Sequence, residues 1–198
     1  MRAQWVIGLT AALALGGCST VSQPGMGGPA LTAAPEACHA ESVESVPGRA
    51  WWAWQRWRYS SDAAATAAYT ALLQGQSPWP DWFAPVESDL PAGTRLQMAL
   101  GLGQTVDQPG GFATFDNITS VAQVRDDLAV LKAWKPDVDR VVIYETVQPM
   151  RVRIGPIGPQ IDPGECRLLM GRWSQVQMLV PSADRMTYLR VIEVRPLP

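Results

Sequence analysis

The beginning of the chain has the pattern of an export signal. Met1 and Arg2 give a short basic start, and the stretch from Trp5 to Leu15 is almost entirely apolar. A run of this length is too short to cross the roughly 30 Å of hydrocarbon in a bilayer. A basic start, a short apolar run and a small-residue exit are typical of a secretory signal peptide. We therefore expect the rest of the chain to fold outside the cytosol, where disulfides form and persist.

The apolar run ends in the sequence Leu-Gly-Gly-Cys, which closes at Cys18. This ending resembles the lipobox of bacterial lipoproteins. The resemblance implies cleavage before Cys18, with residues 1–17 as signal peptide, and lipid on the Cys18 thiol. The non-acidic Ser19 that follows implies the outer membrane, facing the periplasm. Two or three acyl chains hold a protein stably on a membrane, where a single chain is marginal. The alternative is an ordinary secretory signal with an incidental cysteine.

Composition excludes several classes of function. About 180 residues follow the signal, which is enough for one domain with a normal core. The formal net charge is −2 and no basic stripe is present, so we expect no nucleic-acid partner. The single histidine, His39, is next to Cys38 but lacks the spacing of a metal site. We therefore expect no metal.

The cysteine count predicts one disulfide. With Cys18 used for lipid, Cys38 and Cys166 remain, and an even pair in an oxidising compartment is read as one bridge. The closed loop is long, so the chain-entropy model gives on the order of 4–5 kcal/mol of stabilisation. The alternative is two free buried thiols.

The chain divides into four parts by composition. Residues 18–37 are rich in Gly, Pro and Ser and are expected to be a flexible tether. Residues 38–89 contain a Trp-rich, Ala-rich stretch, with a helix expected over 49–74 and broken near 60–61. Residues 90–198 are mainly strand-like. Strands are expected near residues 94–99, 112–116, 140–148, 151–154, 175–180 and 188–195, with one helix from about 119 to 134. The predicted class is α+β, with a mixed, mainly antiparallel sheet after the helical segment.

One segment carries a second resemblance. Its spacing of Tyr, Glu, Val, Pro, Gly and Ile resembles the strand–turn–strand of the tuberculosis necrotizing toxin domain family. The matching positions are Tyr144, Glu145, Val147, Pro149, Val152, Gly155, Ile157 and Pro159. Residues 90–96 resemble the opening L-P-x-G-T-x-L of that family, and residues 111–114 resemble its next segment. The resemblance implies an ADP-ribosyltransferase-like fold and an NAD-directed activity, as an NAD glycohydrolase or an ADP-ribosyltransferase, with NAD as substrate and no prosthetic group. The alternative is a β-sheet lipoprotein whose prolines merely end strands.

The sequence departs from the family at two positions that matter for chemistry. The family has an arginine soon after G-T-x-L to hold the cofactor phosphates, and here Met98 takes its place. The family's P-G-G-G is followed by a catalytic glutamine, whereas here Pro163-Gly164 is followed by Glu165. Gln160, Gln175 and Gln177 are nearby but out of register.

These observations predict one pocket bordered by the strands near 94–99, 112–116 and 140–148, with the glycine-rich loop 101–111 as its floor. An aromatic ring would stack on a flat base, polar side chains would bond to it, a carboxylate would support an oxocarbenium-like ribosyl centre, and an arginine would hold the pyrophosphate. The expected site residues are Arg95, Phe112, Thr114, Tyr144, Gln160, Glu165 and Arg167.

A non-catalytic function is the second hypothesis. Fold likeness does not carry activity with it, and the periplasm is expected to contain little NAD. In this hypothesis the protein is an envelope lipoprotein that binds a protein partner or a cell-wall component. The cluster at Trp51, Trp52, Trp54 and Trp57 either fixes a helix to the domain, binds a partner, or lies near lipid headgroups.

Overall fold

The computed structural model describes residues 38–75 and 78–198, so the predicted signal, tether and lipidated Cys18 lie outside the described residues. Within this part the helices are α1 (Val46–Gln55), α2 (Asp62–Gly75), α3 (Val121–Asp126) and α4 (Arg185–Tyr188), with 3-10 turns η1 (Arg56–Arg58) and η2 (Ser182–Asp184). The strands are β1 (Val86–Leu90), β2 (Arg95–Leu100), β3 (Phe112–Ala113), β4 (Arg140–Thr146), β5 (Met150–Pro156), β6 (Gln160–Asp162), β7 (Arg167–Leu169), β8 (Ser174–Met178) and β9 (Leu189–Pro196).

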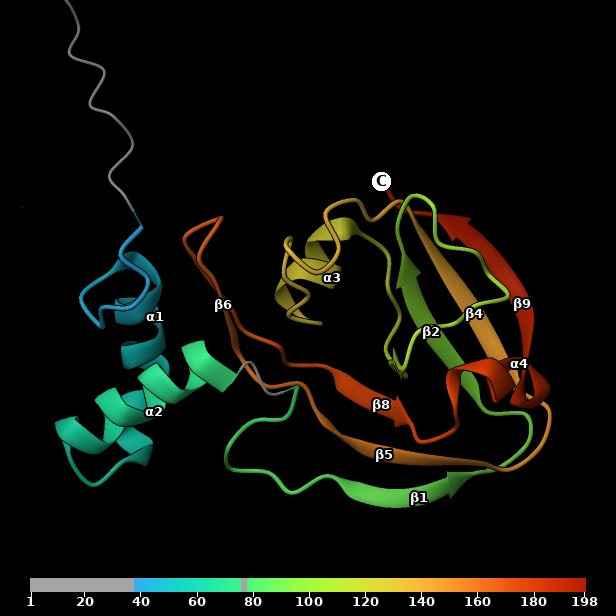
Figure 1. Cartoon of the computed structure of the whole chain (residues 1–198), viewed down its shortest axis with the longest axis horizontal. Coiled ribbons are helices and arrows are strands. Elements are labelled where there is room, and N and C mark those ends of the chain that lie inside the picture. Colours follow the sequence, from blue (N-terminus) through green and yellow to red (C-terminus); the bar gives the residue numbers. More distant parts are fainter. Residues whose placement is uncertain (1–37, 76–77) are drawn as a thin grey trace, which may run out of the picture. The chain divides into compact units, whose positions relative to one another are not determined.

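The strands form two main sheets and a hairpin (Figure 1). One sheet has the order β1-β5-β8-β3, the other has the order β2-β4-β9, and β6 pairs with β7. Every described pairing is antiparallel, and a bridge between Gln97 and Thr114 links the two main sheets. The predicted α+β class is confirmed. The sheet was predicted to be mixed and mainly antiparallel, and the described strand pairs are all antiparallel. Strand β1 pairs with β5, so the first strand of this sheet begins at Val86. It lies inside residues 38–89, which were predicted to form the helical segment.

The main core lies between the two sheets. Its buried side chains come from alternate positions of facing strands, as for Leu96 and Met98 on β2 and Val176 and Met178 on β8. Tyr144 of β4 also belongs to this core. A second cluster under α3 contains Ile118, Val124 and Val141, so strand β4 is covered on both faces.

The helical segment begins earlier than predicted, at Val46 instead of residue 49, and Pro47 and Gly48 belong to its first turn. Ser45 caps α1 by accepting a hydrogen bond from the Gly48 amide at 3.1 Å. Helix α2 is mainly alanine, the best helix former, and Asp62 opens it where the helix dipole favours negative charge. The chain breaks between them at residues 59–61, as predicted.

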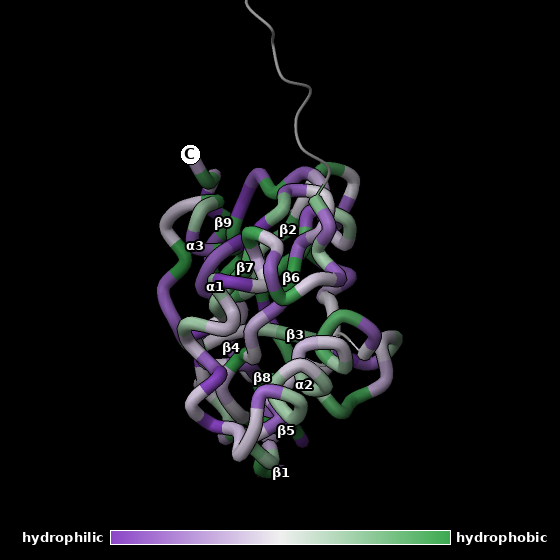
Figure 2. Tube along the Cα trace, turned by 90° about the vertical axis from the view of Figure 1, so that its left-hand side faces the viewer, coloured by the Kyte–Doolittle hydropathy of each residue, from purple (hydrophilic) through white to green (hydrophobic). Residues whose placement is uncertain are grey.

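This segment packs on the β6–β7 hairpin (Figures 1 and 2). Helix α1 contacts β7 and helix α2 contacts β6, and the shared core contains Trp51, Tyr69 and Ile161. Of the clustered tryptophans, Trp51 is buried, whereas Trp54 is 62% exposed. The interpretation that tryptophan fixes the helix to the domain is therefore right for Trp51 and wrong for Trp54.

Helix α3 is shorter than predicted. It begins at a capping box of Ser120 and Gln123, as expected, but it ends at Asp126 instead of near Trp134. The carbonyls of Asp126 and Asp127 accept hydrogen bonds from the backbone amides of residues 171–173, which replace the next helical turn. Periodicity alone does not show this competition from a distant segment.

Candidate functional site

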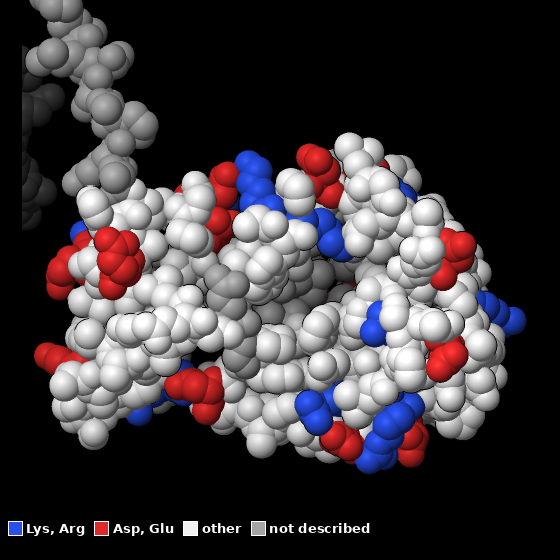
Figure 3. Space-filling view, viewed as in Figure 1, with Lys and Arg blue, Asp and Glu red and all other residues white. Residues whose placement is uncertain are grey.

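A cleft of about 200 Å³ opens between strands β2, β3 and β8 and the turn that follows α3. The space-filling view shows a hollow beside the α3 segment, above β8 (Figure 3). Its lining joins apolar side chains with three glutamines, one threonine and one lysine. The lining residues are Gln97, Met98, Ala99, Leu100, Gln104, Gly110, Gly111, Phe112, Ala113, Thr114, Leu128, Val130, Lys135, Ile157 and Gln175.

Phe112 supplies the accessible aromatic ring of the cleft. It is the first residue of β3, it pairs with Gln177 of β8, and it is 43% exposed. Gly110 and Gly111 precede it in the lining and have no side chains that could cover the ring. An exposed ring in a cleft is suited to stacking on a flat heterocycle.

Gln175 supplies a polar group from strand β8. Its side chain is almost buried, its Nε2 donates to the Pro78 carbonyl at 3.2 Å, and it lies opposite Gly155 in the β5–β8 pairing. Among the described residues no donor is bonded to its Oε1, which leaves an acceptor in the cleft. Pro163 lies in the turn of the β6–β7 hairpin, and strand β7 stands between it and Gln175 along the chain, so the ungapped alignment left Gln175 out of register.

Thr114 lies beside a fixed carboxylate. Its hydroxyl donates to Asp116 at 2.9 Å, and the Ser174 amide and hydroxyl also donate to Asp116 at 2.7 and 2.6 Å. Burial alone would raise the pKa of Asp116, but the hydrogen bonds from Ser174 and Thr114 outweigh it and hold that pKa below its ordinary value. This network ties the end of β3 to the start of β8 next to Gln175.

Lys135 is the charged residue in this lining, and sequence analysis did not select it. Its Nζ donates to the Ala99 carbonyl of β2 at 2.6 Å. Burial lowers the pKa of Lys135, and the neighbouring Arg125 and Arg140 lower it further. An ammonium group held in a partly desolvated cleft attracts an anion more strongly than one in water does.

Tyr144 lies outside the cleft, which corrects the prediction for it. It is fully buried between the sheets, and its hydroxyl donates to the Val106 carbonyl at 2.8 Å. Burial, with a contribution from Asp107, raises the pKa of Tyr144 to about 12. Its alternation with Val142 and Thr146 places it on the core face of β4. Its hydrogen bond to Val106 fixes the loop 101–111 to this strand.

The remaining predicted residues do not line the cleft either. Arg95 pairs with Glu145 on the exposed end of β2 at 3.5 Å, and Arg167 pairs with Asp126 at 2.7 Å. Glu165 pairs with Lys132 in the hairpin turn. Gln160 is buried at the start of β6. Of the seven predicted site residues, the structure therefore places only Phe112 and Thr114 in the cleft. Arg95 lies at the exposed end of β2 and Tyr144 on the core face of β4, while Gln160, Glu165 and Arg167 belong to the β6–β7 hairpin.

No group of metal-ligating side chains occurs within residues 38–75 and 78–198. None of the helices in this part of the chain is long and apolar enough to span a bilayer. The disulfide predicted from the cysteine count is present: Cys38 is bonded to Cys166, with their Cα atoms 5.5 Å apart.

Comparison with known proteins identifies the fold. No family model matches the chain, and no curated protein matches it in sequence. Among solved structures it is similar to Tne2 in complex with Tni2, with 25% identity over 61% of this chain and 98% of that chain and a TM-score of 0.51. It also matches Rhs1-CT in complex with its cognate immunity protein RhsI1 (21% identity, 58% and 81% covered, TM-score 0.42) and Tse6 in complex with Tsi6 (14%, 71% and 90%, 0.38). The chain thus contains a domain with a toxin-like fold similar to that of Tne2.

Proposed function

We propose that the toxin-like domain is an NAD glycohydrolase and that the cleft with Phe112, Thr114 and Gln175 is its active site. One observation carries the proposal: the cleft brings an exposed ring, the amide side chain of Gln175 and one cation together in a fold similar to that of Tne2. The necrotizing toxin resemblance in residues 144–159 supports the same activity.

In the proposed reaction the bond between nicotinamide and the ribose anomeric carbon breaks, and nicotinamide leaves with the bonding electrons. A water oxygen bonds to the anomeric carbon and releases a proton to solvent, which yields ADP-ribose. Phe112 stacks on the nicotinamide ring, and Gln175 Oε1 accepts a hydrogen bond from the attacking water or a ribose hydroxyl. Thr114 and Asp116 hold Ser174, next to Gln175, in position.

Lys135 is proposed to hold the pyrophosphate. Met98, which stands at the place of the family's arginine, lines the cleft but offers no charge. The ammonium of Lys135 lies in the same lining and supplies a positive charge from the segment after α3. A lysine binds phosphate as a point charge, without the two parallel bonds that an arginine forms. We therefore expect weaker phosphate binding here than in members that have the arginine.

A protein partner and a membrane anchor complete the proposal. The similar Tne2 structure contains a second protein, Tni2, and we propose that a protein partner also binds this domain. We further propose that lipid on Cys18 holds the chain on the outer membrane, facing the periplasm. Because the periplasm is expected to contain little NAD, we propose that the substrate is NAD that enters the periplasm from elsewhere.

A second candidate is a non-catalytic envelope protein that binds a protein partner or a cell-wall component. The presence of Met98 in place of a phosphate-binding arginine favours it. Calorimetry on the folded mature protein separates the two candidates first. Heat of binding with NAD and with ADP-ribose at millimolar concentration supports the nucleotide cleft, whereas no heat from either ligand favours the second candidate.

A further inference from the structure

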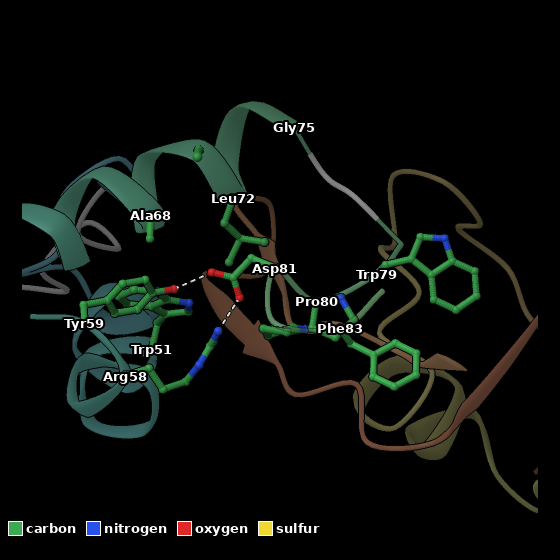
Figure 4. Close-up of a pocket in the computed structure, with 12 residues that line it drawn as sticks. Trp51, Arg58, Tyr59, Ala68, Leu72, Gly75, Trp79, Pro80, Asp81 and Phe83 are labelled. Atoms are coloured by element: carbon green, nitrogen blue, oxygen red, sulfur yellow. Dashed lines mark hydrogen bonds and ion pairs between the residues drawn. The ribbon is translucent and has the colours of Figure 1, made fainter. Parts of the chain in front are cut away.

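A larger groove lies away from the cleft, between helix α2 and the segment around residues 79–83 (Figure 4). Its volume is about 370 Å³. One wall is a single face of α2, made by Ala68, Ala71, Leu72 and Gly75. These positions span two turns, so the wall is about 10 Å long at 1.5 Å per residue. A groove of this shape fits an extended chain better than a compact ligand.

Aromatic and proline side chains make up most of the rest of the lining. Trp51 and Tyr59 stack on each other at one end, with ring centroids 5.8 Å apart. Trp79, Pro80, Phe83 and Pro159 complete the lining. Contacts of this kind favour hydrocarbon, since removal of apolar surface from water supplies most of the binding free energy.

The polar side chains of the groove are bonded to one another. The two carboxylate oxygens of Asp81 accept hydrogen bonds from Arg58 at 2.6 Å and from the Tyr59 hydroxyl at 2.7 Å (Figure 4). A peptide in the groove would bury backbone amides without partners, at a cost of about 1–3 kcal/mol each. A hydrocarbon chain has no such groups.

Two exposed tryptophans lie near these polar groups, Trp82 through a contact with Arg58 and Trp57 as the neighbour of Arg58 in the sequence. Trp57 precedes Arg58 and is 78% exposed, and Trp82 is 55% exposed. The Arg58 guanidinium carbon lies 5.7 Å from the centroid of the Trp82 ring. Tryptophan is enriched where membrane proteins meet the headgroup layer, because its ring is amphipathic.

We propose that this groove binds one acyl chain of a membrane lipid, with the lipid headgroup near Arg58 and Asp81 and with Trp57 and Trp82 in the headgroup layer. The helical segment then has a function of its own, independent of NAD. Its packing on the β6–β7 hairpin holds the groove beside the toxin-like domain.

The test uses the exported chain with Cys18→Ser, so that no attached lipid contributes. The probe is cis-parinaric acid, a fluorescent fatty acid that accepts energy from tryptophan, and the competitor is lysophosphatidylcholine. We expect saturable binding of the probe and its displacement by the lipid. Ala71→Phe, which fills the groove from an exposed position of α2, should weaken binding about tenfold or more. The matched control is Ala67→Phe, which is exposed on α2 outside the lining and should change nothing.

Any of the following results would overturn the proposal. The first is no saturable binding by the folded protein, or an equal effect of the two variants. The second is displacement of the probe by a proline-rich peptide but not by the lipid, which assigns the groove to a protein partner. The third is binding by the Cys18→Ser protein but not by the natively lipidated protein, which assigns the groove to the chain's own lipid.

Discussion

Cys166 lies in the turn of the β6–β7 hairpin and is bonded to Cys38, the first residue that the structure describes, 128 positions earlier. The hairpin lies between Pro159 and β8 along the chain. Cys166, in the turn of the hairpin, has a positive φ of 51°. The bridge therefore fastens the start of the helical segment to the same hairpin on which Trp51 and Tyr69 pack. The hairpin thus attaches the helical segment to the domain and also moves Gln175 away from its expected place in the sequence.

Removal of this bridge should destabilise the protein. For a loop of 128 residues, the chain-entropy model predicts a loss of about 4–5 kcal/mol from the free energy of unfolding. We expect this loss in the Cys38→Ser/Cys166→Ser double variant, measured by urea denaturation. Peptide mapping without reductant should yield one cross-linked pair in the parent protein. Two alkylatable thiols in the native parent would contradict the account.

Asp116 should contribute stability that depends on pH. Because its pKa in the fold is held below the ordinary value of 3.8, its contribution is fully present above that value and is lost as pH falls through the lowered pKa. Asp116→Asn should lower the free energy of unfolding by about 1–3 kcal/mol at neutral pH, because the bonds from Ser174 and Thr114 weaken. The difference from the parent should narrow in acid. The control is Asp137→Asn at an exposed position, and an equal effect of the two variants would refute this role.

Sequence patterns predicted six of the nine described strands, missed β1, β6 and β7, and predicted the site only in part. Alternation along residues 140–148 located β4, because successive side chains of a strand point to opposite faces, and Pro149 marked the boundary between β4 and β5. The β6–β7 hairpin was missed, since three-residue strands carry no usable period. Because of that miss, Gln160 and Arg167 were expected in the site, whereas Gln175 of β8 lines the cleft. Lys135 was passed over because the helix was expected to continue to Trp134, and only the true end of α3 at Asp126 brings the following turn to the cleft.

The proposed lipid anchor makes a prediction of its own. Cys18→Ser should move the protein from the membrane fraction to the soluble periplasmic fraction, because one groove for an acyl chain holds a protein far less firmly than covalent lipid. Metabolic labelling with palmitate should mark the parent protein and not the variant. If the parent and the variant both remain in the membrane fraction and neither incorporates palmitate, the lipobox assignment is wrong.

Lys135 should be required for binding the phosphates of NAD. Lys135→Gln should weaken NAD binding about five- to tenfold in calorimetry, while Lys135→Arg retains the charge and most of the affinity. Because its pKa is lowered from the ordinary 10.5, the affinity of the parent should fall as pH rises through that lowered value, and the Arg variant should not show this fall. Lys132→Gln is the matched control, since Lys132 pairs with Glu165 outside the cleft. Equal losses for the Lys132 and Lys135 variants would exclude a specific role.

Release of nicotinamide tests the central claim most directly. The folded mature protein is incubated with NAD, and nicotinamide and ADP-ribose are measured by chromatography, beside a Gln175→Ala variant whose folding is verified by circular dichroism. The account predicts equal amounts of nicotinamide and ADP-ribose from the parent, and at least about a hundredfold slower release from the variant, the scale of losing one positioned catalytic group. Absence of nicotinamide from the parent at millimolar NAD, or unchanged release from the Gln175→Ala variant, would contradict it.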